Sequence, residues 1–123
     1  MAEKPKKIRY TSRSLERHIL APREHAWSVF LTALERGVGD GDTLVETVLS
    51  FEPPWRRSSR IEGDMPLDFY ERTFVLRDDG DECHLSCGVV VDPEPTEAGW
   101  EFLDLAMDVV GGFMDQVVER AQA

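Results

Sequence analysis

The last stretch of the chain, residues 96–122, constrains the fold more than any other part of the sequence. Acidic residues at positions 101, 104, 108, 115 and 119 mark one side of it. Apolar residues recur on the other side at alternating steps of three and four, as Trp100, Leu103, Met107, Val110, Met114, Val117 and Ala121. This spacing is typical of one face of an α-helix, here roughly 40 Å long at 1.5 Å per residue. Such a face needs a broad sheet or another long helix to cover it.

The size and charge of the chain exclude several classes of protein. A length of 123 residues predicts one domain, residues 1–123, with residues 1–8 as a flexible basic arm. A hydrophobic content of 41% is enough for a true core. The net charge of −10 argues against nucleic acid or an anionic membrane as the main partner. No apolar run approaches the ~18–20 residues of a membrane span, and no signal-peptide core follows the N-terminus.

The two cysteines, Cys83 and Cys87, lie four residues apart. On a strand their separation would be about 13 Å, beyond the ~7 Å reach of a disulfide. Reduced thiols indicate a cytoplasmic protein. His84 would face away from both cysteines, and His18 and His25 form no metal motif with it. We therefore expect no metal site and no cofactor.

Before the final helix, the pattern predicts one strand, one short helix and four further strands. The predicted strands cover residues 9–20, 44–52, 55–61, 67–77 and 82–91, and the helix covers residues 22–36. The turns between the last four strands are short, and Asp79-Gly80 is a strong hairpin signal. These strands should therefore be antiparallel neighbours in an α+β layered fold.

Two glycine-rich segments require separate interpretation. The segment 37–42 follows a helix and leads into a strand, which is the wrong order for a dinucleotide-binding loop, so we interpret it as a turn. Gly111 and Gly112 stand in the middle of the final helix, where each costs about 1 kcal/mol relative to alanine. Close packing against the sheet, a kink, or room for a ligand would explain them, and close packing is favoured.

Three sequence segments, taken in their order along the chain, resemble the START-like, Bet v 1-like superfamily, also called SRPBCC or polyketide cyclase/dehydrase-like proteins. They are His18-Ile-Leu-Ala-Pro-Arg-Glu-His-Ala-Trp27, Val48-Leu-Ser-Phe-Glu-Pro-Pro-Trp-Arg-Arg57, and Tyr70-Glu-Arg-Thr-Phe-Val-Leu76 with its Asp-Gly turn and Cys83-His-Leu-Ser-Cys87. The resemblance covers nearly the whole chain. It implies a helix-grip fold, in which a curved antiparallel sheet of about five strands carries a short N-terminal helix and a long C-terminal helix. One hairpin usual in the family is missing, which makes this a shortened member.

The resemblance also implies a pocket between the long helix and the sheet. The expected lining residues are Phe51, Trp55, Arg57, Tyr70, Cys87, Leu103, Met107, Val110 and Met114. Simple core packing is the alternative for each of them. For Arg57, a charge at the pocket mouth competes with a cross-strand surface pair to Glu71, and the surface pair is favoured.

Three functions fit these expectations. The first is binding of a small hydrophobic or aromatic ligand, including a lipid-like one. The second is a polyketide cyclase/dehydratase-like enzyme with Tyr70 as a general acid, by analogy with the family. The third is a non-catalytic interaction subunit, as a monomer or as a homodimer formed through an exposed strand edge. No catalytic motif is present, so we favour binding.

Overall fold

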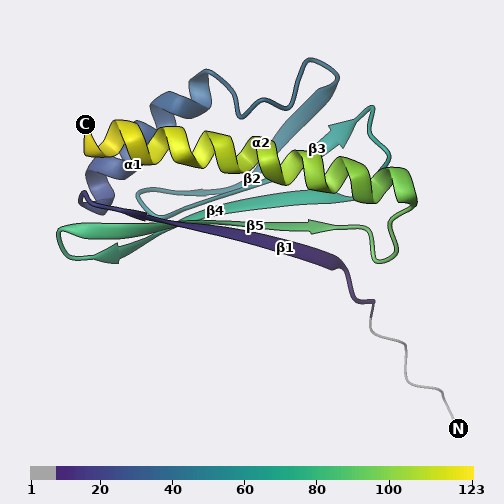
Figure 1. The fold of residues 1–123 in the computed structure, drawn as a ribbon, viewed down its shortest axis with the longest axis horizontal. Coiled ribbons are helices and arrows are strands. Elements are labelled where there is room, and N and C mark those ends of the chain that lie inside the picture. The colour runs from purple at the N-terminus through teal and green to yellow at the C-terminus, as the bar shows by residue number, and fades with distance from the viewer. Residues whose placement is uncertain (1–7) are drawn as a thin grey trace, which may run out of the picture.

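The computed structural model describes residues 8–123, so residues 1–7 of the predicted arm lie outside the described residues. The elements in chain order are β1 (Thr11–Ile19), α1 (Arg23–Glu35), β2 (Leu44–Glu52), β3 (Arg56–Gly63), β4 (Tyr70–Asp79), β5 (Glu82–Val91) and α2 (Glu97–Gln122). The strands form one antiparallel sheet in the order β1-β5-β4-β3-β2. Helix α2 runs along the sheet, and α1 packs beside its C-terminal half (Figure 1). The predicted helix-grip α+β fold is confirmed.

Helix α2 begins where its N-cap predicts. The hydroxyl oxygen of Thr96 accepts a hydrogen bond from the backbone N–H of Gly99 at 3.1 Å. The apolar stripe faces the sheet and the acidic side faces water, as predicted. Trp100 is the exception, because its side chain remains 38% exposed. It lies under the guanidinium of Arg13 at 5.2 Å, so it forms a cation–π contact at the margin of the sheet.

The core lies between the sheet and the two helices. Strands β4 and β5 alternate strictly between buried and half-buried residues over most of their length, because one face meets the helices and the other does not. Trp27, Phe30, Phe74 and Phe113 form a connected aromatic cluster where α1, α2 and β4 meet. Neither helix among residues 8–123 combines the length and the apolar content that crossing a membrane requires.

Strand β4 begins three residues later than predicted. The carboxylate of Asp92 accepts hydrogen bonds from the backbone N–H groups of Asp68 and Phe69, at 3.0 and 2.7 Å. These donors are therefore satisfied by a side chain instead of by a neighbouring strand. The contact ties the segment before β4 to the junction between β5 and α2.

Strand β2 departs from the predicted alternation. A bulge between Val48 and Ser50 shifts its register against β3. Because a shift of one residue reverses the two faces of a strand, Val48 and Phe51 line the same groove beside α1. Strict alternation along residues 44–52 would place Val45 and Leu49 on the same face as Phe51, but both are among the most exposed apolar residues. The edge position of β2 explains why so much of it remains uncovered.

Candidate functional site: a buried arginine and a small pocket under helix α2

Strand β4 places a charged side chain within the core. Tyr70, Arg72, Phe74 and Leu76 share the helix-facing side, and Arg72 is only 1% exposed. The guanidinium of Arg72 lies 5.9 Å from the ring of Tyr70 and 5.8 Å from that of Phe74. A buried guanidinium is stable only when opposite charges and hydrogen bonds compensate its lost hydration.

Two acidic residues provide that compensation. The carboxylate of Asp40 accepts two hydrogen bonds from Arg72, both 3.0 Å long, in a bidentate arrangement. Glu46 lies 3.4 Å from the same guanidinium and 2.7 Å from that of Arg57, so two acids and two arginines form one neutral network. Burial alone would lower the pKa of Arg72, but the hydrogen bonds and charge of Asp40 raise it above its ordinary value. The hydrogen bond from Arg57 lowers the pKa of Glu46.

The glycine-rich loop between α1 and β2 places Asp40 next to Arg72 in this network. Gly39 has a φ of +108°, which side-chain-bearing residues rarely adopt, and a Cβ there would lie 2.9 Å from the Cγ1 of Val109 on α2. The loop therefore passes directly against α2.

A small pocket lies between this loop, α2 and the sheet. Its volume is about 100 Å³, and it is lined by Gly39, Asp40, Leu44, Tyr70, Phe102, Leu105, Ala106 and Val109. On the other side of the loop is a more open hollow of about 340 Å³, which Arg72 and Glu46 also border. Gly39, Asp40 and Leu44 border both spaces, so the loop is the partition between them.

Tyr70 and Asp40 are the polar residues that line the pocket. Tyr70 is only 2% exposed, and its hydroxyl makes no hydrogen bond of good geometry among residues 8–123, although the guanidinium of Arg72 lies beside its ring. Burial raises the pKa of Tyr70, and the neighbouring charge of Arg72 only partly opposes this effect. The phenol is therefore neutral near pH 7 and can donate a hydrogen bond. The Nε of Arg72 is a second buried donor without a partner in the described chain.

The nine residues predicted to line a pocket occupy five environments. Tyr70 lines the small pocket under α2, and Met107 is half-buried on the same helix. Phe51 and Arg57 border the groove between α1 and β2, and Trp55 borders a trough on the opposite face of the sheet. The remaining four are buried in the core: Cys87, Leu103, Val110 and Met114.

Several residues at the pocket were absent from the predicted set. Phe102, Ala106 and Val109 fall on the margin of the helix stripe, and Asp40 lies in a loop interpreted only as a turn. The burial of Arg72 could have been predicted from the sequence, since Arg72 alternates with Tyr70 and Phe74 on one strand face, and a charge in such a position indicates a buried ion pair. The predicted partner of Arg57 also differs, because Arg57 pairs with Glu46, whereas Arg60 pairs with Glu71 at 2.7 Å.

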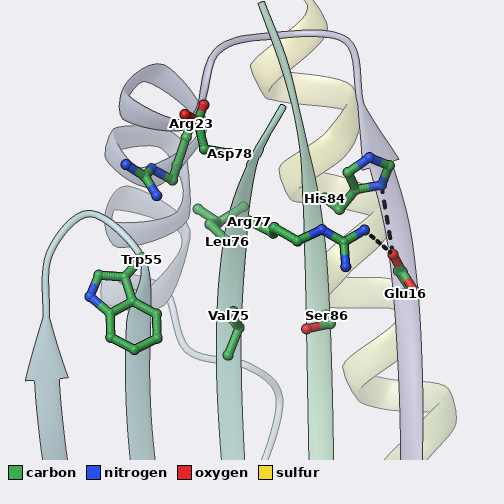
Figure 2. Close-up of a pocket in the computed structure, with 9 residues that line it drawn as sticks. All are labelled: Glu16, Arg23, Trp55, Val75, Leu76, Arg77, Asp78, His84 and Ser86. Carbon is green, nitrogen blue, oxygen red and sulfur yellow. Dashed lines mark hydrogen bonds and ion pairs between the residues drawn. The ribbon is translucent and has the colours of Figure 1, made fainter. Parts of the chain in front are cut away.

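The outer face of the sheet carries a broad, shallow trough of about 490 Å³. Figure 2 shows Trp55, Val75 and Ser86 along it, with both helices behind the strands. The guanidinium of Arg77 and the ring of His84 approach the carboxylate of Glu16 at one end, at 3.5 and 3.6 Å. This end of the trough is polar and differs in character from the pocket under α2.

No protein-family model and no curated protein matches the chain by sequence, whereas many solved structures share its fold. An uncharacterised protein from Bacillus thuringiensis has a TM-score of 0.73 at 13% identity, over 92% of this chain and 100% of that one. A START superfamily protein from Mycobacterium smegmatis has a TM-score of 0.63 at 13% identity, over 91% and 99%. The Bet v 1-type allergen Ara h 8.0201 has a TM-score of 0.63 at 8% identity, over 89% and 99%.

The chain therefore has the START-like, Bet v 1-like fold, which confirms the resemblance drawn from its sequence. Likeness at these identities establishes the fold, and the function must be argued from the site itself.

Proposed function

We propose that the protein binds a small, mainly apolar ligand carrying one hydrogen-bond acceptor, in the pocket between α2 and the sheet. The observation that carries this proposal is that Tyr70 lines a largely apolar pocket and that its buried hydroxyl makes no hydrogen bond of good geometry among the described residues. A buried donor without a partner costs about 1–3 kcal/mol, and a ligand carbonyl or ether oxygen would recover that free energy.

The size of the pocket limits the ligand. Its volume of about 100 Å³ is below the ~150 Å³ of an engineered cavity that binds benzene, so a ligand with one aromatic ring would fill it and extend a short substituent through its open side. A lipid-like ligand would require the loop to move away from α2. The pocket and the outer hollow would then join into a space within the ~300–1,000 Å³ range of ordinary ligand sites.

Two matched probes test the proposal. Acetophenone has a carbonyl oxygen that can accept from Tyr70, whereas ethylbenzene has nearly the same shape and no acceptor. In an NMR titration we expect both to shift backbone signals of residues 39–44 and 102–109. We expect Tyr70→Phe to weaken acetophenone roughly fivefold, the equivalent of about 1 kcal/mol, and to leave ethylbenzene unchanged.

Tyr10→Phe is the matched control, because Tyr10 is the other tyrosine of the chain and lies exposed against Phe69. Ala106→Leu should fill the pocket and weaken both probes. An absence of saturable shifts in the wild-type protein would refute the proposal. So would an unchanged preference for acetophenone in Tyr70→Phe.

A catalytic role for Tyr70, as in a cyclase or dehydratase, is less well supported. A general acid works best when its pKa lies near the working pH. Burial moves the pKa of Tyr70 in the opposite direction, further above its ordinary value of 10.0. The hydroxyl is therefore better suited to hold an acceptor than to transfer its proton.

Self-association through β2 is a second candidate function. This edge strand leaves Val45, Val48, Leu49 and Phe51 between 45% and 64% exposed. A second copy of the chain could extend the sheet by antiparallel pairing at this edge. Light scattering at high concentration tests this, with a dimer expected for the wild-type protein and a monomer for Val45→Lys. A wild-type monomer would exclude it.

A further inference from the structure

Six ionisable side chains converge on the outer face of the sheet, near the β4–β5 turn. Strand β1 provides Glu16 and His18, β5 provides Glu82 and His84, and β4 provides Arg77 and Asp79. His18 lies directly opposite His84, and His84 lies opposite Arg77 on the other side. Glu82 lies opposite Asp79. Directly paired residues project from the same face of a sheet, so the pairing gathers all six side chains.

The side chains of this cluster are close together. The two imidazole rings are stacked, with centroids 4.8 Å apart. The Nε2 of His84 lies 3.1 Å from Asp79, and the Nε2 of His18 lies 3.2 Å from Glu82. One donor atom from each of His18, Asp79 and His84 lies within 4.8 Å of the other two. Three carboxylates and one guanidinium surround the two rings, so the local charge is negative when both histidines are neutral.

We infer that His18, His84 and Asp79 bind a first-row divalent cation of the Zn²⁺ class. Two neutral imidazoles and one carboxylate are a donor set that such cations prefer, and calcium or magnesium would instead require a set made mainly of oxygens. The net charge of −10 adds a field that attracts cations to the whole molecule.

The neighbouring carboxylates complete the site. Glu16 lies 3.6 Å from the Nδ1 of His84, where it can accept that N–H and leave Nε2 as the donor to the metal. Glu82, beside the Nε2 of His18, is placed to provide a fourth donor. Arg77 lies 3.5 Å from Glu16 and keeps that carboxylate oriented toward the cluster.

Only a small rearrangement is needed to close this site. Tetrahedral coordination at 2.0–2.1 Å places donor atoms about 3.3 Å apart. In the structure, the donor atoms of His18, Asp79 and His84 lie within 4.8 Å of one another. His18 and Asp79 are exposed and His84 is partly exposed, so their side chains can rotate without disturbing the core. The bound cation would join β1, β4 and β5. The site faces away from the pocket under α2, so the two proposals stand or fall separately.

Sequence spacing predicts no metal site, because His84 has no second histidine near it in the sequence and the two cysteines beside it face the other way. The prediction that His84 faces away from both cysteines is confirmed, since Cys83 and Cys87 are buried beneath the helices. The pairing of β1 with β5 places His18, 66 positions away in the sequence, beside His84 on the outer face of the sheet. Spacing alone cannot reveal that neighbour.

Titration of metal-free protein with Zn²⁺ tests the inference by isothermal calorimetry, with Co²⁺ absorption as a spectroscopic readout. We expect one equivalent to bind the wild-type protein and His25→Gln, the matched control, since His25 is the remaining histidine and lies on α1. His18→Gln and His84→Gln should each weaken binding by more than tenfold, and Glu82→Gln by about tenfold.

The remaining readouts separate this site from weak surface binding. Zn²⁺ should raise the Tm of the wild-type protein and of His25→Gln, since a ligand that binds only the folded state stabilises it. It should leave the Tm of His18→Gln/His84→Gln unchanged. Equal binding by the double variant would overturn the inference, as would the absence of a saturable 1:1 complex in the wild-type protein.

Discussion

The bidentate pair between Asp40 and Arg72 is the interaction on which the core depends most at the scale of single residues. We expect Asp40→Asn to lower the free energy of unfolding by about 3 kcal/mol, because it leaves a buried guanidinium with only the more distant Glu46. Urea denaturation measures this. Glu71→Gln is the control, since it breaks the more exposed pair with Arg60 and should leave stability close to wild type. Equal losses in the two variants would contradict the special role of Arg72.

Glu46 links the same network to pH. Its pKa is lowered in the folded state, chiefly by the hydrogen bond from Arg57, so its ionised form stabilises the fold above the ordinary value of 4.5. That contribution is lost as the pH falls below 4.5 through the lower folded-state value. We therefore expect the Tm difference between wild type and Glu46→Gln to be largest near neutral pH and to narrow in acid. A difference that stays constant down to acid unfolding would show that Glu46 is not the titrating group.

Sequence periodicity is most informative where the neighbours of a residue lie on the same element, as along the apolar stripe of α2. Tyr70 was expected at the pocket from the family resemblance, and it lines the small pocket under α2. Asp40 and Glu46 were beyond reach, because their role depends on a loop and a strand edge that meet Arg72 only in three dimensions.

At the scale of elements, the two glycines of α2 differ in their surroundings. A Cβ at Gly112 would meet no atom within 4 Å, whereas one at Gly111 would lie 3.3 Å from a guanidinium nitrogen of Arg17. Arg17 is held by Asp115 at 2.7 Å and cannot move freely. We expect Gly112→Ala to raise the free energy of unfolding by about 1 kcal/mol, and Gly111→Ala to give less or none of this gain. Thermal denaturation compares the two. Equal gains would show that close packing does not explain Gly111.

The glycine loop can be tested in the same way. Gly39 and Gly41 both have positive φ, so alanine should cost about 1 kcal/mol or more at either position. Only Gly39 also approaches Val109, so Gly39→Ala should cost more than Gly41→Ala. Adding Val109→Ala should recover that excess in Gly39→Ala and recover nothing in Gly41→Ala. Failure of this rescue would mean that the loop does not press against α2 as described.

At this scale, sequence predicts the bounds of a strand where local turn residues set them, and fails where hydrogen bonds from a distant residue or a bulge set them. Strands β2 and β5 have the predicted bounds, because sharp turn residues flank them. The start of β4 was placed too early, since the sequence does not show that Asp92 captures the preceding backbone. The bulge in β2 likewise leaves no signature in the sequence, which is why strict alternation misplaces Val45 and Leu49 relative to Phe51.

At the scale of the whole molecule, the sheet separates two different environments. The helix-facing side holds the core, the neutral network of Arg72 and the small pocket. The outer side holds the trough and the histidine cluster with its carboxylates. The glycine-rich loop limits the volume under α2, because Gly39 and Asp40 form part of the wall of the pocket. On the proposed function, this pocket is therefore expected to favour small ligands.

The charge of −10 gives the last prediction. Like charges repel more strongly in the compact state than in the unfolded chain, and salt reduces this cost. Raising NaCl from about 10 to 150 mM shortens the Debye length from about 30 to 8 Å, which is less than the length of α2. We expect the Tm to rise by roughly 4 °C, the equivalent of about 1 kcal/mol for a chain of this size.

This effect must be separated from cation binding at the histidine cluster. The His18→Gln/His84→Gln variant should show the same NaCl dependence as the wild-type protein, because screening acts on the total charge and not on one site. Arg72 is buried and Asp40 is partly buried, so their pair is largely shielded from bulk ions and should oppose the trend only weakly. A Tm that falls with NaCl would mean that the attractive pairs of the network, and not the net repulsion, dominate the electrostatic free energy of this fold.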